Sequence, residues 1–150
     1  MREEGQKGSR CEVKGNVIKS FRDLEVYKRL LQLHLEVHEL TMGFPRYELY
    51  ELGSQVRRSS NSAPANLAEG WNNKHTKIYL EGISRAIGEV QETGHHLDVA
   101  RDKKHLQLSQ HTALIARYEE CEKMLWGLAR AVERSNGSLS PRPSHLAPLT

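Results

Sequence analysis

The chain has 150 residues, of which 37% are hydrophobic and 27% are charged, and its formal net charge is +3. This length favours a single domain, and the mild basicity permits a nucleic-acid partner without requiring one. No apolar run reaches the roughly 20 residues of a membrane-spanning helix, and the N-terminal residues lack the apolar segment of a signal peptide. Cys11 and Cys121 fit no metal or redox spacing. We therefore expect a cytoplasmic protein with reduced thiols.

The two ends of the chain differ in composition from its middle. Residues 1–20 are charged and rich in glycine, whereas residues 135–150 hold three of the five prolines together with four serines. We expect a disordered N-terminal tail over 1–20 and a flexible, non-helical C-terminal tail over 135–150. The folded domain is then predicted to span residues 21–134.

Residues 26–44 form the first of four segments in which hydrophobic residues recur at alternating intervals of three and four, as on one face of a helix. A second apolar stripe, which includes Leu31 and Leu35, lies beside the first and predicts burial on two sides. We expect Asp23 to cap this helix and the Gly-Phe-Pro sequence at 43–45 to end it.

The same alternation continues in residues 49–70, 80–97 and 111–132. Thr76 is a candidate cap for the third helix and Ser109 for the fourth. The connections between segments are short, which favours antiparallel neighbours. The sequence therefore predicts an all-α fold, an up-down-up-down antiparallel four-helix bundle.

The second half of the second helix, SQVRRSSNSAPANLAEGW at 54–71, has mainly small residues along its predicted seam. Ser59, Ala63 and Gly70 allow the backbone of a neighbouring helix to approach closely. Pro64 removes a backbone hydrogen bond and clashes with the preceding turn, so we expect a kinked second helix.

Asn66 and Glu69 fall on or beside the same seam. A buried amide or carboxylate needs hydrogen-bond partners. We therefore expect these two side chains to form a structural polar network with a neighbouring helix, rather than a catalytic pair.

Basic side chains recur on the second and third helices and could form a stripe along one flank that contacts phosphates. For Arg57 and Arg58, the alternatives are a solvated helix face or salt bridges to carboxylates such as Glu51. The candidate nucleic-acid-binding residues are Arg57, Arg58, Lys74, His75, Lys77 and Arg85.

The sequence offers no strong catalytic or metal-binding pattern. Glu92 and His95 have the spacing of a di-iron motif, but the motif occurs once instead of twice. His34 and His38 could share a metal ion, yet no third ligand is evident. Cys121 lies within the predicted seam, where a thiol usually fills space. We expect no enzyme activity, no metal site and no cofactor.

Three stretches resemble the bacterial four helix bundle protein family: FRDLEVYKRLLQL, SQVRRSSNSAPANLAEGW and YLEGISRAIGEVQETGHHLDVA. The first-described members of that family are encoded within intervening sequences of large-subunit ribosomal RNA genes. A related branch is the accessory variability determinant of diversity-generating retroelements. The resemblance covers about residues 21–134.

The resemblance implies a four-helix subunit of a homopentamer that binds nucleic acid and does no chemistry itself. Arg57 and Arg58 match a basic pair of the family's second helix, and Asn66, Glu69 and Gly70 match its packing motif. Many relatives follow that motif with an aromatic residue, glycine and arginine. Here the sequence from 71 to 75 is WNNKH, so the arginine is missing and Lys74 takes its place.

Three interpretations compete. The first is a nucleic-acid-binding accessory protein that serves the reverse transcriptase of a retroelement. The second is an RNA-associated protein encoded in a ribosomal RNA intervening sequence. The third is a structural or protein-interaction bundle whose basic flank only keeps it in solution. We favour the first, on the resemblance alone, with RNA or DNA as partner.

Overall fold

The computed structural model of the chain describes residues 17–139. Four long helices, α2 (Glu25–Met42), α3 (Leu52–Gly70), α4 (Thr76–Asp102) and α5 (Leu108–Leu139), follow one another in the chain. Two short 3-10 helices, η1 (Phe21–Asp23) and η2 (Arg46–Glu48), precede α2 and α3. The expectations for residues 1–16 and 140–150 lie outside the described part of the chain.

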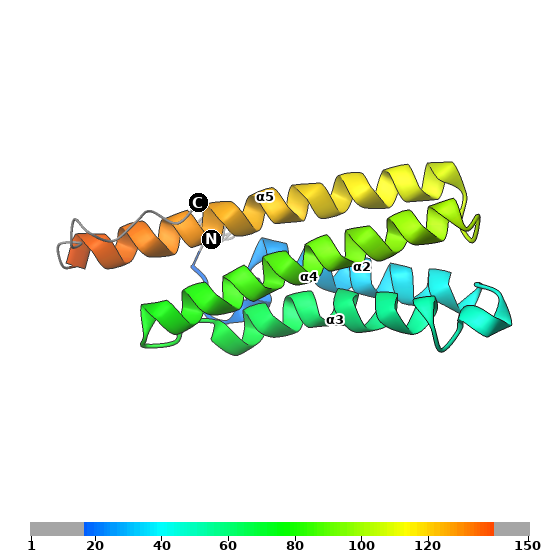
Figure 1. The fold of residues 1–150 in the computed structure, drawn as a ribbon. Helices are drawn as coiled ribbons and strands as arrows, with labels where there is room; N and C mark the ends of the chain where they lie inside the picture. The colour runs from blue at the N-terminus through cyan, green and yellow to red at the C-terminus, as the bar shows by residue number, and fades with distance from the viewer. Residues whose placement is uncertain (1–16, 140–150) are drawn as a thin grey trace, which may run out of the picture.

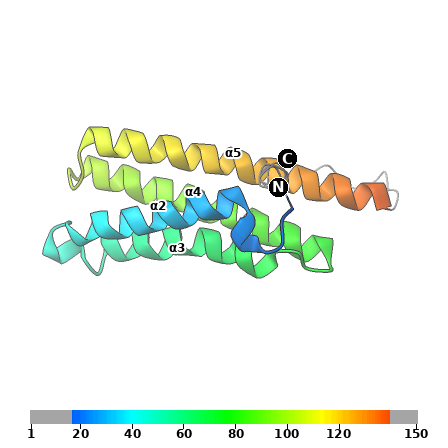
Figure 2. The ribbon, with the colours of Figure 1, turned by 180° about the vertical axis from the view of Figure 1, so that it is seen from behind.

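The four long helices pack side by side as an antiparallel bundle (Figure 1). Each helix contacts the next one in the chain, and α2 closes the bundle against α5 through a less extensive contact. η1 packs against α2 and α3 at one end (Figure 2). The predicted all-α four-helix bundle is therefore confirmed. None of the described helices combines the length and the apolarity needed to cross a membrane.

The hydrophobic alternation of the sequence forms the core. α2 buries Val26, Leu30, Leu33 and Val37, as its spacing predicts. The other three helices bury side chains at the same intervals, among them Val56, Ala63, Ile83, Ile87, Val90, Leu97, Leu114, Tyr118, Cys121 and Leu125. In α3 the buried seam passes through Leu67 instead of Asn66, because burying the larger apolar side chain is more favourable.

The small residues of α3 bring its backbone close to that of α4. A Cβ atom added to Gly82 would lie 2.9 Å from the carbonyl oxygen of Asn66 and 3.2 Å from the Cα of Gly70. Both neighbours are backbone atoms of α3, which cannot move aside unless the helix moves with them. The close approach that the sequence predicted is thus present where α3 ends. α3 also runs without a break through Pro64, and its kink stays a prediction.

The ends of several helices differ from the expectations. Asp23 does not cap α2: it belongs to η1 and accepts hydrogen bonds from the backbone of Lys19 and Ser20. Thr76 is the first residue of α4 and follows the N-cap, and Ser109 lies inside α5. α5 continues past residue 134 to Leu139, because no proline interrupts the chain before Pro141.

Candidate nucleic-acid interface

Arg57 is tied to the bundle itself. Its Nη1 donates to Thr41 Oγ1 at 3.0 Å, and its Nη2 donates to the carbonyl oxygen of Leu49 at 2.6 Å. The first acceptor lies near the end of α2 and the second follows η2. Arg57 therefore fastens the connection between α2 and α3, and its guanidinium is not free for a phosphate.

Arg58 points to the other side of α3 and pairs with carboxylates of α4. Its Nη2 donates to Glu92 and lies 3.5 Å from Glu89 Oε1. The hydrogen bond that Arg58 donates to Glu92 raises the pKa of Arg58, and hydrogen bonds from Arg58 and, to a smaller extent, His96 lower the pKa of Glu92. The predicted basic stripe along one flank is therefore not continuous, because its first two members bond to different neighbouring elements.

The other four candidates are exposed. Lys74 and His75 lie in the turn between α3 and α4, and Lys77 and Arg85 lie on α4. Their side chains make no hydrogen bond or ion pair to any part of the chain that the structure describes. The turn is shaped by Asn72, at a φ of 51°, and by Asn73 Oδ1, which accepts from the backbone of His75 at 2.9 Å.

Two further cations lie at this end of the bundle, and the sequence analysis missed them. The end of α5 lies against the α3–α4 turn, since Thr76 Oγ1 donates to Asn136 Oδ1 at 3.4 Å. A cleft of about 290 Å³ between them is lined by residues of both segments. Arg130 and Arg134 belong to this part of α5 and are exposed. The antiparallel topology was the signal that could have placed this end of α5 beside Thr76.

We call this group of side chains the basic pole. It comprises Lys74, His75, Lys77, Arg85, Arg130 and Arg134. Carboxylates are also present, since Glu69 and Glu81 line a small cleft together with Arg85. The cations nevertheless outnumber the neighbouring acids, and α4 begins here without a side-chain cap. Its first backbone N–H groups therefore add partial positive charge to the pole.

The expected polar network of Asn66 and Glu69 does not form within the described chain. Asn66 Nδ2 donates to the carbonyl of Ser62 in its own helix at 2.8 Å. Glu69 is exposed and bonds to no described residue. The recognisable motif at the end of α3 therefore acts through Gly70 and its contact with Gly82, more than through its polar members.

The side chains weighed as metal ligands do not form a metal site in the described chain. The Glu92 carboxylate pairs with Arg58 and His96, whereas His95 is exposed. His34 Nδ1 lies 2.8 Å from Ser60 Oγ. Within residues 17–139, no three potential ligands come together as a metal site would need.

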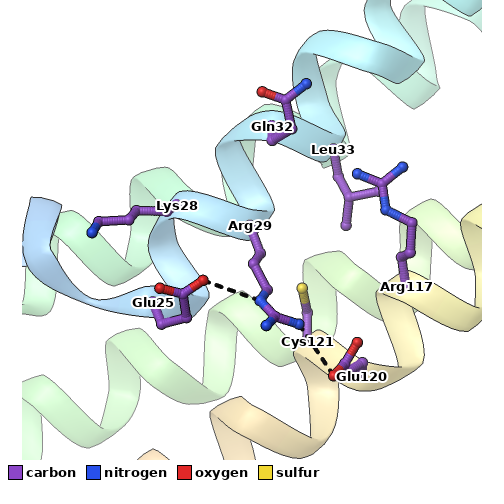
Figure 3. Close-up of a pocket in the computed structure, with 8 residues that line it drawn as sticks. All are labelled: Glu25, Lys28, Arg29, Gln32, Leu33, Arg117, Glu120 and Cys121. Carbon is purple, nitrogen blue, oxygen red and sulfur yellow. Dashed lines mark hydrogen bonds and ion pairs between the residues drawn. The ribbon is translucent and has the colours of Figure 1, made fainter.

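A cleft of about 320 Å³ between α2 and α5 holds Cys121 and two arginines (Figure 3). Arg29 lies between Glu25, at 3.3 Å, and Glu120, at 3.1 Å. Arg117 makes two hydrogen bonds to Glu36, at 2.6 and 2.9 Å. Both arginines are thus already neutralised. Burial raises the pKa of Cys121 to about 11, so its thiol stays protonated at neutral pH and is a poor nucleophile.

Comparison with known proteins agrees with the resemblance seen in the sequence. A family model described as 23S rRNA-intervening sequence protein matches residues 22–127. A comparison with curated proteins finds no match. The matched range covers α2, α3 and α4 in full and most of α5.

Proposed function

The chain belongs to the 23S rRNA-intervening sequence protein family, and from this premise we propose that it is a non-enzymatic, oligomeric RNA-binding protein of the cytoplasm. The observation that carries the proposal is the basic pole. Its cations are exposed and have no partner among the described residues, whereas Arg57, Arg58, Arg29 and Arg117 are all bonded within the bundle.

Unpaired cations on one end of a protein favour a polyanionic partner. Lysine and arginine contacts to phosphates release counterions and supply most of the sequence-independent affinity for nucleic acids. The uncapped start of α4 adds backbone N–H groups that suit the same phosphates. We propose RNA over DNA because the family description names a ribosomal RNA intervening sequence.

Oligomer formation would strengthen this site. A net charge of +3 is modest for one chain, but a ring of five subunits, as the family resemblance implies, repeats the basic pole five times and raises its field. The outer surface of α2 supports a subunit contact, since Leu31 is 37% and Leu35 is 53% exposed. Light scattering should return the mass of an oligomer; a monomer mass at micromolar concentration contradicts this part of the proposal.

A reverse-transcriptase partner is the second candidate, and it rests on the resemblance to the retroelement branch. Gene neighbourhood separates the two candidates. A reverse-transcriptase gene next to this one supports the accessory role, and a surrounding ribosomal RNA gene supports association with that RNA. Absence of both neighbours would leave the structural bundle as the better interpretation.

RNA binding across a salt series tests the function. We expect the double variant Lys74→Ala/Lys77→Ala to bind RNA more weakly and to flatten the slope of log affinity against log salt by about 0.7–0.9 for each lost contact. The matched control is Lys28→Ala/Lys123→Ala, which removes two exposed cations outside the basic pole. Equal slopes for both variants, or no binding by the unmodified protein at about 50 mM salt, would overturn the proposal.

A further inference from the structure

The end of the bundle opposite to the basic pole presents two tyrosine rings. Tyr47 and Tyr50 lie in the connection between α2 and α3, and they are 70% and 84% exposed. Between them in the sequence stands Glu48, which is only 2% exposed. This short connection thus buries one carboxylate and exposes an aromatic ring on either side of it in the sequence.

Glu48 fixes this connection to the rest of the bundle. One carboxylate oxygen accepts from the backbone N–H of Leu52 at 3.3 Å, and the other accepts from Lys103 Nζ and His105 Nε2, each at 2.9 Å. Lys103 and His105 come from the turn between α4 and α5. A buried carboxylate is costly unless such partners surround it. A loop that only joined two helices would not need one.

Two more contacts hold the same loop from behind. Arg57 Nη2 donates to the carbonyl of Leu49, the residue next to Glu48. At the start of α3, a Cβ atom on Gly53 would lie 2.9 Å from the carbonyl oxygen of Glu48, so the helix packs directly on the loop backbone. The ring of Tyr47 meets His105 edge-on at 6.1 Å between centroids. The tyrosines are therefore presented by a loop whose backbone is fixed on one side.

Two cations are neighbours in the sequence of residues at this site. Arg46 precedes Tyr47, and Lys104 precedes His105, whose ring contacts that of Tyr47. Both are exposed and bond to no side chain within residues 17–139. Nearby, Asp102 is paired with Arg101 at 3.0 Å, and Glu51 is exposed. This end of the bundle therefore carries exposed charges beside the rings, together with the exposed apolar side chains of Met42 and Leu108.

We propose that Tyr47 and Tyr50 form a stacking platform for unpaired bases of RNA, with Arg46 and Lys104 contacting the adjacent phosphates. The inference rests on the proposed RNA-binding function and adds the class of RNA, one with single-stranded segments. Aromatic rings with open faces beside cations suit bases, which stack on either face regardless of sequence. Tyrosine is also common in protein contacts, so loss of assembly in a tyrosine variant would point to such a contact instead.

The test compares a single-stranded oligouridine of about 12 nucleotides with a fully paired RNA duplex of about 12 base pairs. We expect Tyr47→Leu/Tyr50→Leu to lose at least about fivefold in affinity for the single strand for each stacked base, and to bind the duplex unchanged. Tyr47→Phe/Tyr50→Phe keeps both rings and should bind the single strand like the unmodified protein. Thermal melting and light scattering verify that each variant keeps its fold and assembly.

The outcomes separate this inference from the function beneath it. If the unmodified protein binds neither RNA, the proposed function fails and the platform with it. If it binds both while the leucine variant matches it on the single strand, the function stands and the platform is wrong. If the leucine variant loses assembly instead of affinity, the tyrosines belong to a protein contact, and the proposal is overturned. Lys74→Ala/Lys77→Ala should weaken binding to both RNAs.

Discussion

The two ends of the bundle use similar residues in opposite ways. One end of the bundle holds the α2–α3 and α4–α5 connections. There Glu48 accepts hydrogen bonds from Lys103 and His105, and Arg57 donates to the backbone of Leu49, so the two connections are held together. At the other end, the cations of the basic pole reach solvent without a partner in the described chain. We call the first end the locked pole. These four side chains of the locked pole serve the structure, whereas the cations of the basic pole remain for a ligand.

This difference teaches that a count of charges does not locate a binding surface. Arg57 and Arg58 are the most conspicuous basic pair in the sequence, yet both are bonded to other residues of the bundle. Lys74 and Lys77 have no such partner among the described residues. What decides is whether a neighbouring element brings an acceptor within reach, and that is a property of the packing.

The largest effect is expected at the locked pole, from Glu48→Ala. The substitution removes the acceptor of the Leu52 backbone N–H and of the His105 ring Nε2. A buried pair broken on one side typically costs about 3–5 kcal/mol of folding free energy. Urea unfolding followed by circular dichroism measures it. Glu51→Ala, an exposed neighbour, should change stability by less than about 0.5 kcal/mol. Equal effects from the two would show that the buried Glu48 does not lock this pole.

A smaller loss is expected from Gly82→Ala, near the basic pole. The added methyl group would meet backbone atoms of α3 at 2.9 and 3.2 Å, so the two helices must separate, at a cost of about 2–3 kcal/mol. Gly88→Ala is the matched control on the same helix, where an added Cβ meets nothing within 4 Å. It should stabilise the protein by about 0.5–1 kcal/mol, because alanine favours helix.

The same pair of variants probes how the pole is built. Gly82 lies between Lys77 and Arg85 on α4, so a displaced α4 should also weaken RNA binding, whereas Gly88→Ala should leave it unchanged. A Gly82→Ala protein as stable as the original would mean that the close helix contact is not what orders this end.

The two adjacent arginines give a third, smaller contrast. Arg57→Ala removes hydrogen bonds from a charged donor to Thr41 and to the Leu49 carbonyl, and should cost about 1.5–2 kcal/mol. Arg58 is half exposed in its ion pair with Glu92, so Arg58→Ala should cost less than about 1 kcal/mol. Chemical denaturation compares them. If either variant binds RNA more weakly while fully folded, that arginine returns to the interface.

The fold was predictable because its signal is local. The spacing of Val26, Leu30, Leu33 and Val37 specifies one helix face without reference to the rest of the chain. The sequence analysis placed Asn66 on the buried seam of α3, whereas the structure buries Leu67 there. Asn66 is three residues after Ala63 and Leu67 is four, and both intervals fit a helix face. The free energy gained by burying the leucine side chain decides between the two positions. Ser20 and Asp23 have the spacing of a capping box, which η1 forms and which the sequence could have revealed.

The site was less predictable because its state depends on pairs distant in the chain. Arg57 meets Thr41 across 16 residues, and Arg58 meets Glu92 across 34. Hydrophobic periodicity predicts which face of a helix is buried, but not the register that brings one polar side chain opposite another. For the same reason, Arg130 and Arg134 could not be assigned to the basic pole from spacing alone.

The smallest effect is expected for the ion pair of Glu36 and Arg117, and it tests whether an exposed ion pair stabilises the folded protein. Arg117 holds the pKa of Glu36 down, from 4.5 to about 2. A carboxyl with a lowered pKa stabilises the folded state above its unfolded pKa, and this contribution disappears as the pH falls from about 4.5 towards 2. Both side chains of the pair are about 40% exposed, so water screens it and the contribution is at most about 1 kcal/mol.

Glu36→Gln isolates this contribution from the other carboxyls whose pKa values are lowered, since Glu48 and Glu92 titrate in both proteins. The difference in unfolding free energy between the two proteins should be small near neutral pH and shrink towards zero as the medium is acidified. Urea titrations at several pH values measure it. A difference that did not depend on pH would mean that Glu36 acts by packing and not by charge. If Glu36→Gln lowered the unfolding free energy as much as Glu48→Ala does, solvent exposure would not decide how much an ion pair stabilises this protein.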